Sequence, residues 1–153
     1  SVIIGAIPGA LPPMMGWVSV TGTLDPMAWS LFSILFIWQI PHFMAISIYY
    51  AVDYKEAGLQ VYPNIKGNFW SLRQIVTFTV LLFAAALSPF YLGYLGKPYQ
   101  VSGSLLSLIF LALAIRGFFV RKDPGLFKIW ARQYFLGSIV YLPLLMIAMI
   151  FFK

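Results

Sequence analysis

The chain has 153 residues, of which 61% are hydrophobic and only 9% are charged, whereas about a quarter of the residues in a soluble domain carry a charge. This balance excludes an ordinary soluble domain. Because the basic residues behind the net charge of +6 gather beside long apolar segments, it favours a membrane protein over a nucleic-acid-binding one. The sequence contains no cysteine, which excludes disulfides, thiolate catalysis and cysteine-ligated metals.

The first apolar segment covers residues 2–20 and contains three prolines and three glycines. Because proline removes backbone donors, we expect a kinked or broken helix here. Two interpretations stay open: a helix packed closely through its small residues, or the wall of a cavity. No basic region precedes the segment, so it does not resemble a signal peptide. Since the chain starts at Ser1, we expect an N-terminal part of the protein to precede it.

The remaining apolar segments predict four more membrane spans in an all-α bundle. Asp25 is expected to cap the second helix, with Pro26 at its first helical position. Ser71 and Gln74 have capping-box spacing and mark the start of the third. Each span provides roughly the 20 residues that a hydrocarbon core of about 30 Å requires. The predicted spans are residues 2–20, 27–50, 71–96, 101–120 and 133–152.

Two polar connections separate the later spans. Residues 97–100 are predicted to form a tight turn, and residues 121–124 are expected to end the fourth span. Residues 126–134 then alternate apolar side chains with Lys128 and Arg132, a pattern that predicts a short amphipathic stretch suited to the headgroup layer.

The basic residues are distributed unevenly between the two ends of the predicted bundle. Eight Lys and Arg side chains fall in residues 51–73 and 116–132, whereas the other end holds Lys97 and Lys153. The positive-inside rule therefore places both large loops on the cytoplasmic or matrix side.

Residues that could perform chemistry concentrate between positions 38 and 67. His42, the only histidine in the sequence, falls within a predicted span, where an ionisable group is costly. It is either a neutral histidine hydrogen-bonded between helices or a contact for a substrate or cofactor. If the second helix stays regular, spacings of three, four and seven residues place one set of side chains on a single stripe. That set is Trp38, His42, Ala45, Tyr49, Asp53 and Glu56.

The loop that follows carries two carboxylates and several cations. Asp53 and Glu56 at i and i+3 could bind Mg²⁺ together with substrate phosphates, or form a solvated helix end. Lys55, Lys66 and Arg73 could neutralise a diphosphate, or simply satisfy the positive-inside rule.

The order of motifs in this region is that of a known family. W-x-x-P-H-F at residues 38–43 is followed about ten residues later by D-Y-x-x-A-G, and then by P-x-x-x-G. Together with GALPPMMGWVSVTGTL upstream and ARQYFLGSIVYLP downstream, the sequence resembles the C-terminal half of UbiA-type intramembrane prenyltransferases of the protohaem IX farnesyltransferase (haem O synthase) kind. The resemblance implies that residues 1–153 are the C-terminal part of one membrane domain. They would supply about five of nine helices around a central cavity.

The resemblance also implies a reaction: transfer of a farnesyl group from farnesyl diphosphate to a vinyl group of haem B, giving haem O. Mg²⁺ would be held by Asp53 and Glu56 together with the diphosphate. Many relatives have D-x-x-x-D in this loop, whereas this sequence has Ala57 at the second aspartate, which leaves Glu56 as the nearby second carboxylate. Lys66 and His42 would complete the catalytic set. Substrate-binding roles would fall to Trp38, Tyr49, Tyr54, Lys55 and Arg73.

The superfamily's other aspartate motif, N-x-x-x-D-x-x-x-D, does not occur in these residues, so this chain alone is expected to be inactive. The implied partners are farnesyl diphosphate, haem B and membrane lipid, with a downstream haem-modifying enzyme or oxidase assembly factors and no nucleic acid. The implied location is a bacterial or archaeal cell membrane, or the mitochondrial inner membrane of a eukaryote. A UbiA-type enzyme with another acceptor, a transporter fragment with broken helices, and a non-catalytic assembly subunit remain the alternatives.

Overall fold

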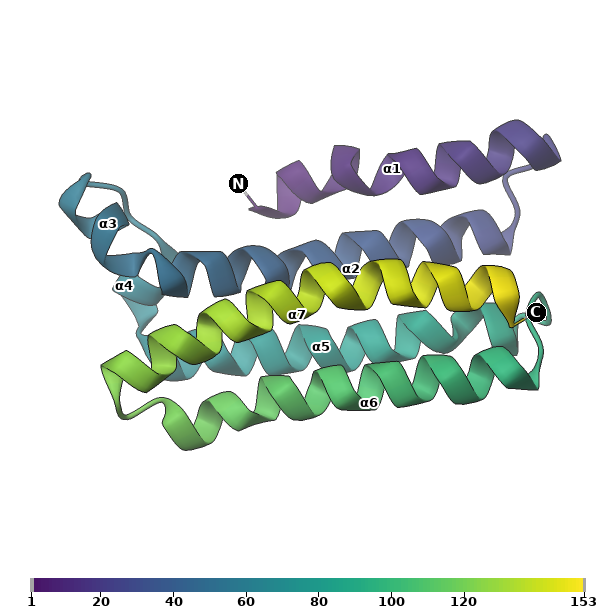
Figure 1. Cartoon of the computed structure of the whole chain (residues 1–153). Helices are drawn as coiled ribbons and strands as arrows, with labels where there is room; N and C mark the ends of the chain where they lie inside the picture. The colour runs from purple at the N-terminus through teal and green to yellow at the C-terminus, as the bar shows by residue number, and fades with distance from the viewer. Residues whose placement is uncertain (1, 153) are drawn as a thin grey trace.

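The computed structural model describes residues 2–152, which form seven helices (Figure 1). Five of these are long and apolar enough to cross a membrane, so the predicted all-α polytopic fold is confirmed. No strand occurs among residues 2–152. The helices are α1 (Val2–Thr21), α2 (Pro26–Tyr49), α3 (Ala51–Glu56), α4 (Tyr62–Lys66), α5 (Asn68–Tyr91), α6 (Lys97–Val120) and α7 (Pro124–Phe151).

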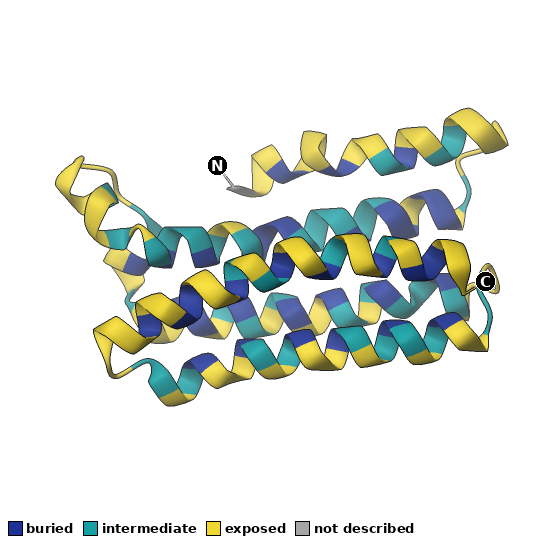
Figure 2. Ribbon diagram, viewed as in Figure 1, coloured by how far each residue is buried: buried dark blue, intermediate teal, exposed yellow. Residues whose placement is uncertain are grey.

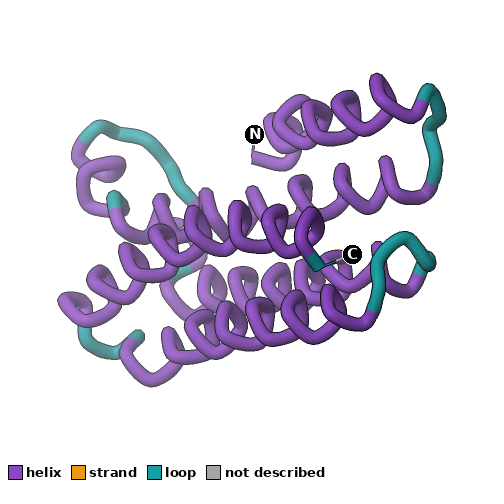
Figure 3. The backbone as a smooth tube through the Cα atoms, turned by 45° about the vertical axis from the view of Figure 1, so that its right-hand side comes forward, coloured by secondary structure: helices purple, strands orange, loops and turns teal. Residues whose placement is uncertain are grey.

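Helix α2 lies at the centre of the bundle and packs against α1, α5 and α7. Helices α5, α6 and α7 pack in sequence order, while α1 lies along one side of α2 (Figures 1 and 3). Of the most apolar window of each helix, 44% is buried in α2 but only 17% in α1. Exposed residues cover the outer faces of the long helices and most of α3 and α4 (Figure 2).

Helix α1 runs uninterrupted through its three prolines, so a break, one of the two predicted outcomes, is excluded. Ala6 and Ala10 are fully buried against the bundle. A Cβ atom at Gly9 would collide with the side chain of Gln39, whose Nε2 donates a hydrogen bond of 3.3 Å to the carbonyl of Ala6. These contacts confirm close packing through small residues.

The helix termini confirm the predicted cap at Asp25 and correct the one predicted at Ser71. The Asp25 carboxylate caps α2 by accepting from the backbone N–H of Ala28 at 3.0 Å. Ser71 does not cap α5, which begins at Asn68. Gly67, with φ of +83°, makes the sharp turn that lets the helix start there. The hydroxyl of Ser71, already inside the helix, donates back to the Gly67 carbonyl at 2.9 Å.

The connection between α5 and α6 also differs from the prediction. Helix α5 ends at Tyr91 instead of residue 96, and Lys97 begins α6 instead of forming a turn. A proline in the first helical turn of α6 explains the difference, because its missing N–H has no helical partner to lose there.

The last span is one helix of 28 residues that begins at Pro124, so the predicted start at residue 133 is wrong and the amphipathic stretch at 126–134 is part of the same helix. The Asp123 carboxylate caps its start by accepting from the backbone N–H groups of Gly125 and Leu126. Phe127, Trp130 and Tyr134 lie three and four residues apart and are buried, so one apolar face continues from the first turn into the span.

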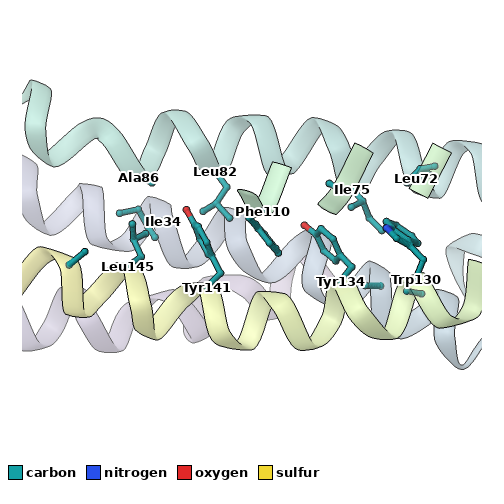
Figure 4. Packing of buried hydrophobic residues seen from close by; sticks show 14 of the residues in the cluster. Ile34, Leu72, Ile75, Leu82, Ala86, Phe110, Trp130, Tyr134, Tyr141 and Leu145 are labelled. Carbon is teal, nitrogen blue, oxygen red and sulfur yellow. The ribbon is translucent and has the colours of Figure 1, made fainter. Parts of the chain in front are cut away.

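Aromatic stacking holds α6 and α7 together (Figure 4). The Phe110 ring lies between those of Tyr134 and Tyr141, with both centroid separations 4.7 Å. Each tyrosine hydroxyl has a buried partner: Tyr134 meets Thr79 at 2.7 Å and Tyr141 meets Ser107 at 2.9 Å. Pairing of buried hydroxyls avoids the desolvation penalty that unpaired polar groups carry in lipid.

Gly117 permits the closest approach in this interface. A Cβ atom at Gly117 would lie 2.6 Å from Leu72 Cδ1 and 2.6 Å from Trp130 Cζ2. We therefore expect Gly117→Ala to lower the free energy of unfolding by about 1–3 kcal/mol through overpacking. Gly103→Ala on the same helix is the control, because its Cβ would meet Tyr99 at an ordinary 3.4 Å and would gain helix propensity. Equal stability of the two variants in a denaturant titration would contradict the packing described here.

Candidate functional site

The segment between α2 and α5 begins with an interruption. Helix α2 ends at Tyr49, and Tyr50, with φ of −99° and ψ of 18°, separates it from the six-residue α3. The second helix therefore does not continue regularly to Asp53, and the predicted stripe from Trp38 to Glu56 is broken at Tyr50. Its lower part, from Trp38 to Tyr49, lies on one continuous helix.

The D-Y-x-x-A-G motif forms a defined helix end. Gly58 has φ of +73°, a conformation in which glycine lacks the steric penalty of other residues. The backbone N–H of Leu59 donates to the Tyr54 carbonyl at 2.8 Å, and that of Gly58 donates to the Lys55 carbonyl at 3.1 Å. This pair of bonds is the Schellman arrangement, which fixes where the chain leaves α3. The glycine of the motif is thus a structural requirement of this helix end.

Two side chains attach α4 to the helices around it. Asn64 Nδ2 donates to the carbonyl of Ala51 at 2.9 Å, joining α4 to the start of α3. Gln74 Nε2 donates to the hydroxyl of Tyr62 at 3.1 Å, joining α4 to α5. The loop is therefore a folded unit at the end of the bundle, visible beyond α2 in Figure 1.

The predicted polar site residues lie on this unit and are mostly exposed. Asp53 lies in the first turn of α3, where the helix dipole favours a negative charge. Because α3 has only six residues, its dipole is small. Glu56 ends the same helix, and Lys66 ends α4. Tyr54 is half-buried. Lys55 and Glu56 line one pocket of about 630 Å³ together with Asn64.

Within residues 2–152 no group of three or more His, Cys, Asp or Glu side chains is placed to hold a metal ion. Asp53 and Glu56 nevertheless suit Mg²⁺, which is commonly bound through one or two carboxylates plus substrate phosphates. Any such site would need further ligands from the substrate or from outside these residues.

Arg73 lies apart from the carboxylates in sequence and on a different helix. Its Cζ atom is 5.1 Å from the ring centroid of Trp70, one turn earlier on α5. The guanidinium is exposed, and the contact with the indole is a cation–π interaction. The structure thus gives Arg73 a local partner without bringing it against α3.

An apolar pocket of about 640 Å³ opens beneath the loop. Its lining comes from four parts of the chain, and its polar groups are concentrated at the loop end. The lining residues are Ile3, Ile4, Ile40, Met44, Ser47, Gln60, Val61, Tyr62, Gln74 and Phe78. None of these lining residues was predicted from the sequence, although the spacing of Ile40, Met44 and Ser47 is that of a common helix face.

His42 is on α2, and its side chain faces α7. Its ring stacks on Trp38 with centroids 4.6 Å apart, and its Nδ1 is 2.6 Å from the hydroxyl oxygen of Ser138. That hydroxyl donates to the carbonyl of Phe135 at 2.6 Å, and Trp38 Nε1 donates to the Ser138 carbonyl at 3.0 Å. Because a hydroxyl has one proton, Nδ1–H must be the donor to Ser138. The lone pair of the neutral ring then resides on Nε2.

The two faces of α2 therefore differ. At about 100° per residue, His42 and Ile40 point roughly 200° apart, and His42 is not among the residues that line the pocket beneath the loop. The hydrogen bond to Ser138 agrees with the interpretation of a histidine bonded between helices. A contact between His42 and haem stays a prediction.

The model of the UbiA prenyltransferase family matches residues 1–139. The chain belongs to the UbiA prenyltransferase family. It is 44% identical over 97% of its length to a protein named protoheme IX farnesyltransferase from Sorangium cellulosum (strain So ce56), covering 52% of that relative. A protein of the same name from Anaeromyxobacter dehalogenans (strain 2CP-C) is 40% identical over 97% of this chain and 49% of its own length.

A third relative of that name, from Myxococcus xanthus (strain DK1622), is 42% identical over 93% of this chain and 47% of its own length. The chain thus spans about half the length of the curated relatives it matches. No solved structure matches it significantly.

The His42–Ser138 bond predicts opposite outcomes for two substitutions. The amide of His42→Asn can occupy the position of Nδ1 and keep a bond to Ser138, whereas the amide of His42→Gln reaches the position of Nε2. We expect His42→Asn to retain most of the stability and His42→Gln to lose about 1 kcal/mol, within the range for such bonds in membranes.

Thermal unfolding in lipid nanodiscs measures the difference, with Ser138→Ala as the background in which it should vanish. Preserved stability in His42→Gln together with a loss in His42→Asn would show that Nε2, and not Nδ1, makes the important contact.

Proposed function

We propose that the protein transfers a farnesyl group from farnesyl diphosphate to a vinyl group of haem B, giving haem O. The observation that carries this proposal is the folded unit at residues 50–67. Its residues Gln60, Val61 and Tyr62 line one end of the apolar pocket, and its short helices carry Asp53, Lys55 and Lys66. An apolar space with a polar end, next to a unit that carries exposed charged side chains, suits a prenyl diphosphate, which has an apolar chain and a charged head. The acceptor follows from the name that the relatives carry.

The chain's own residues would act mainly by binding and orienting the diphosphate. Mg²⁺, when bound by Asp53 and the substrate, would offset negative charge on the leaving group. Lys66 and Lys55, exposed on the same unit, would stabilise the charge that develops as the allylic C–O bond breaks. The electron pair of that bond leaves with the diphosphate. Folding of the loop before substrate arrives lowers the entropic cost of assembling these groups.

The acceptor half of the reaction requires a dry environment. The vinyl π electrons form the new C–C bond, and water then adds to the remaining cationic carbon, releasing one proton and leaving a hydroxyl group. The apolar lining of the pocket, which includes Ile40, Met44 and Phe78, would shield the prenyl cation from water until that bond has formed.

Another acceptor, such as a quinone precursor, would use the same diphosphate site, so the pocket alone supports prenyl transfer in general. The transporter alternative predicts unwound helices at the membrane midplane. Helices α1, α2, α5 and α7 instead run continuously through their prolines within the described residues. The protein is an integral membrane protein. A cytoplasmic or matrix position for residues 50–67 is part of this proposal, as is a downstream haem-modifying partner.

Asp53→Asn tests the assignment of the metal and diphosphate ligand. The assay uses a chimera in which residues 1–153 replace the matching half of the Myxococcus xanthus relative, with extracted haems separated by chromatography. We expect haem O formation to fall at least a hundredfold, because the uncharged amide is a poor Mg²⁺ ligand. Asp123→Asn is the matched control, since asparagine caps a helix about as well as aspartate. Unchanged haem O in Asp53→Asn would refute the assignment.

Lys66→Ala tests whether a cation on α4 acts on the diphosphate. A charge-assisted hydrogen bond contributes about 1.5–3 kcal/mol, so we expect the KM for farnesyl diphosphate to rise about tenfold or more with little change in the KM for haem. Lys97→Ala, at the opposite end of the bundle, should leave both values unchanged. An equal effect on both substrates would show that Lys66 supports the fold of the loop and does not contact the diphosphate.

A further inference from the structure

A separate, basic pocket lies between α2 and α7 near their loop-side ends, which are at the same end of the bundle (Figure 1). Its volume is about 400 Å³. Helix α2 contributes Tyr49, and the first turns of α7 contribute the remaining lining, which includes two cations and two aliphatic side chains. These residues are Gly125, Lys128, Ile129, Arg132, Gln133 and Leu136.

The polar groups of this pocket favour an anion. The Lys128 ammonium lies 5.1 Å from the ring centroid of Tyr49, a cation–π contact that holds the charge across the gap between the two helices. Arg132 follows one turn later on α7, and no carboxylate is among the lining residues. Arg116 Nη1 donates to Gln133 Oε1 at 3.1 Å, which leaves the Gln133 amide nitrogen as a donor.

The length of α7 places these cations at the depth of lipid headgroups. Its 28 residues extend for about 42 Å, which exceeds a hydrocarbon core of about 30 Å by roughly 12 Å. Residues 134–151 of α7 contain no charged side chain, whereas Lys128 and Arg132 lie near its start, so the surplus lies at the Pro124 end. Lys128 and Arg132 fall about 6 and 12 Å from that end, within the surplus.

Below the cations the pocket becomes apolar and remains open. Leu136 is 47% exposed and Ile129 is 55% exposed, so both can contact an acyl chain. The residues that line the pockets around α3 and α4 are different ones, which makes this site separate from the proposed diphosphate site.

We propose that the Tyr49–Lys128–Arg132 pocket binds the phosphate of one anionic phospholipid, with an acyl chain lying along Leu136. Basic pockets between membrane helices on the cation-rich side recognise anionic headgroups in this way. A zwitterionic lipid would bring an ammonium group next to two fixed cations, so the pocket discriminates by net headgroup charge.

The test measures lipid binding to the purified, delipidated chain by native mass spectrometry, with phosphatidylglycerol and phosphatidylcholine as probes. We expect Lys128→Gln with Arg132→Gln to weaken the binding of one phosphatidylglycerol by about 30-fold, which corresponds to about 2 kcal/mol for two charges, and to leave phosphatidylcholine binding unchanged. Lys97→Gln with Lys122→Gln removes the same charge elsewhere and should have little effect. The charge-conserving pair Lys128→Arg with Arg132→Lys should keep the preference and also shows that the variants fold.

Three outcomes would overturn the proposal. The first is equal weakening in both neutralised double variants, which would indicate a general effect of surface charge. The second is a wild-type chain that binds the two lipids equally well. The third is displacement of phosphatidylglycerol by soluble inorganic diphosphate at similar concentration, which would assign the pocket to a phosphate substrate in place of a lipid. None of these depends on haem O formation, so they are separate from the test of the proposed function.

Discussion

The bundle depends on the position of α2, because this helix alone contacts α1, α5 and α7. In lipid there is little hydrophobic drive between helices, so packing and interhelical hydrogen bonds set their positions. Helix α2 makes at least one polar link to each of these three neighbours. Gln39 donates to Ala6 of α1 at 3.3 Å, Ser88 of α5 donates to Ser30 at 2.9 Å, and His42 meets Ser138 of α7 at 2.6 Å.

These links have a functional consequence, because they also fix how α2 is rotated about its axis. With His42 directed toward α7, the face that contains Ile40 and Met44 must face the apolar pocket beneath the loop. The same rotation positions Tyr49 at the start of the loop, where the Lys128 side chain lies over its ring. One helix orientation therefore determines the wall of the candidate prenyl pocket, the start of the loop that carries Asp53, and one side of the proposed lipid pocket.

The sequence predicted the parts of the fold that depend on composition and local rules. Five apolar segments gave five membrane-length helices, and the Asp25 cap forms as expected. The errors concern the residues at which helices begin. Residues 126–134 are amphipathic in the structure, but they belong to α7 and do not precede it, because Trp130 is buried and its Nε1 donates to the carbonyl of Leu113 at 2.8 Å. The start of α5 depends on the backbone of Gly67, a conformation that Ser71 and Gln74 could not reveal.

The candidate site likewise has parts that could be predicted from the sequence and parts that could not. The local motif around Asp53 could be recognised from sequence, and the structure explains its glycine through the φ of +73° at Gly58. Ser138, the partner of His42, is 96 residues away in sequence, and the pocket lining comes from four separate segments, so neither could be predicted from spacing. Among residues 2–152, Asp53 and Glu56 belong to no group of three or more side chains that could hold a metal ion.

The central claim is that residues 50–67 hold a divalent cation through the diphosphate of the substrate. Electron paramagnetic resonance of the chimera with Mn²⁺ in place of Mg²⁺ tests this claim most directly. The account predicts that Mn²⁺ binds tightly only when farnesyl diphosphate is present, with hyperfine coupling to phosphorus that disappears in Asp53→Asn. Phosphorus coupling that is unchanged in Asp53→Asn would contradict it.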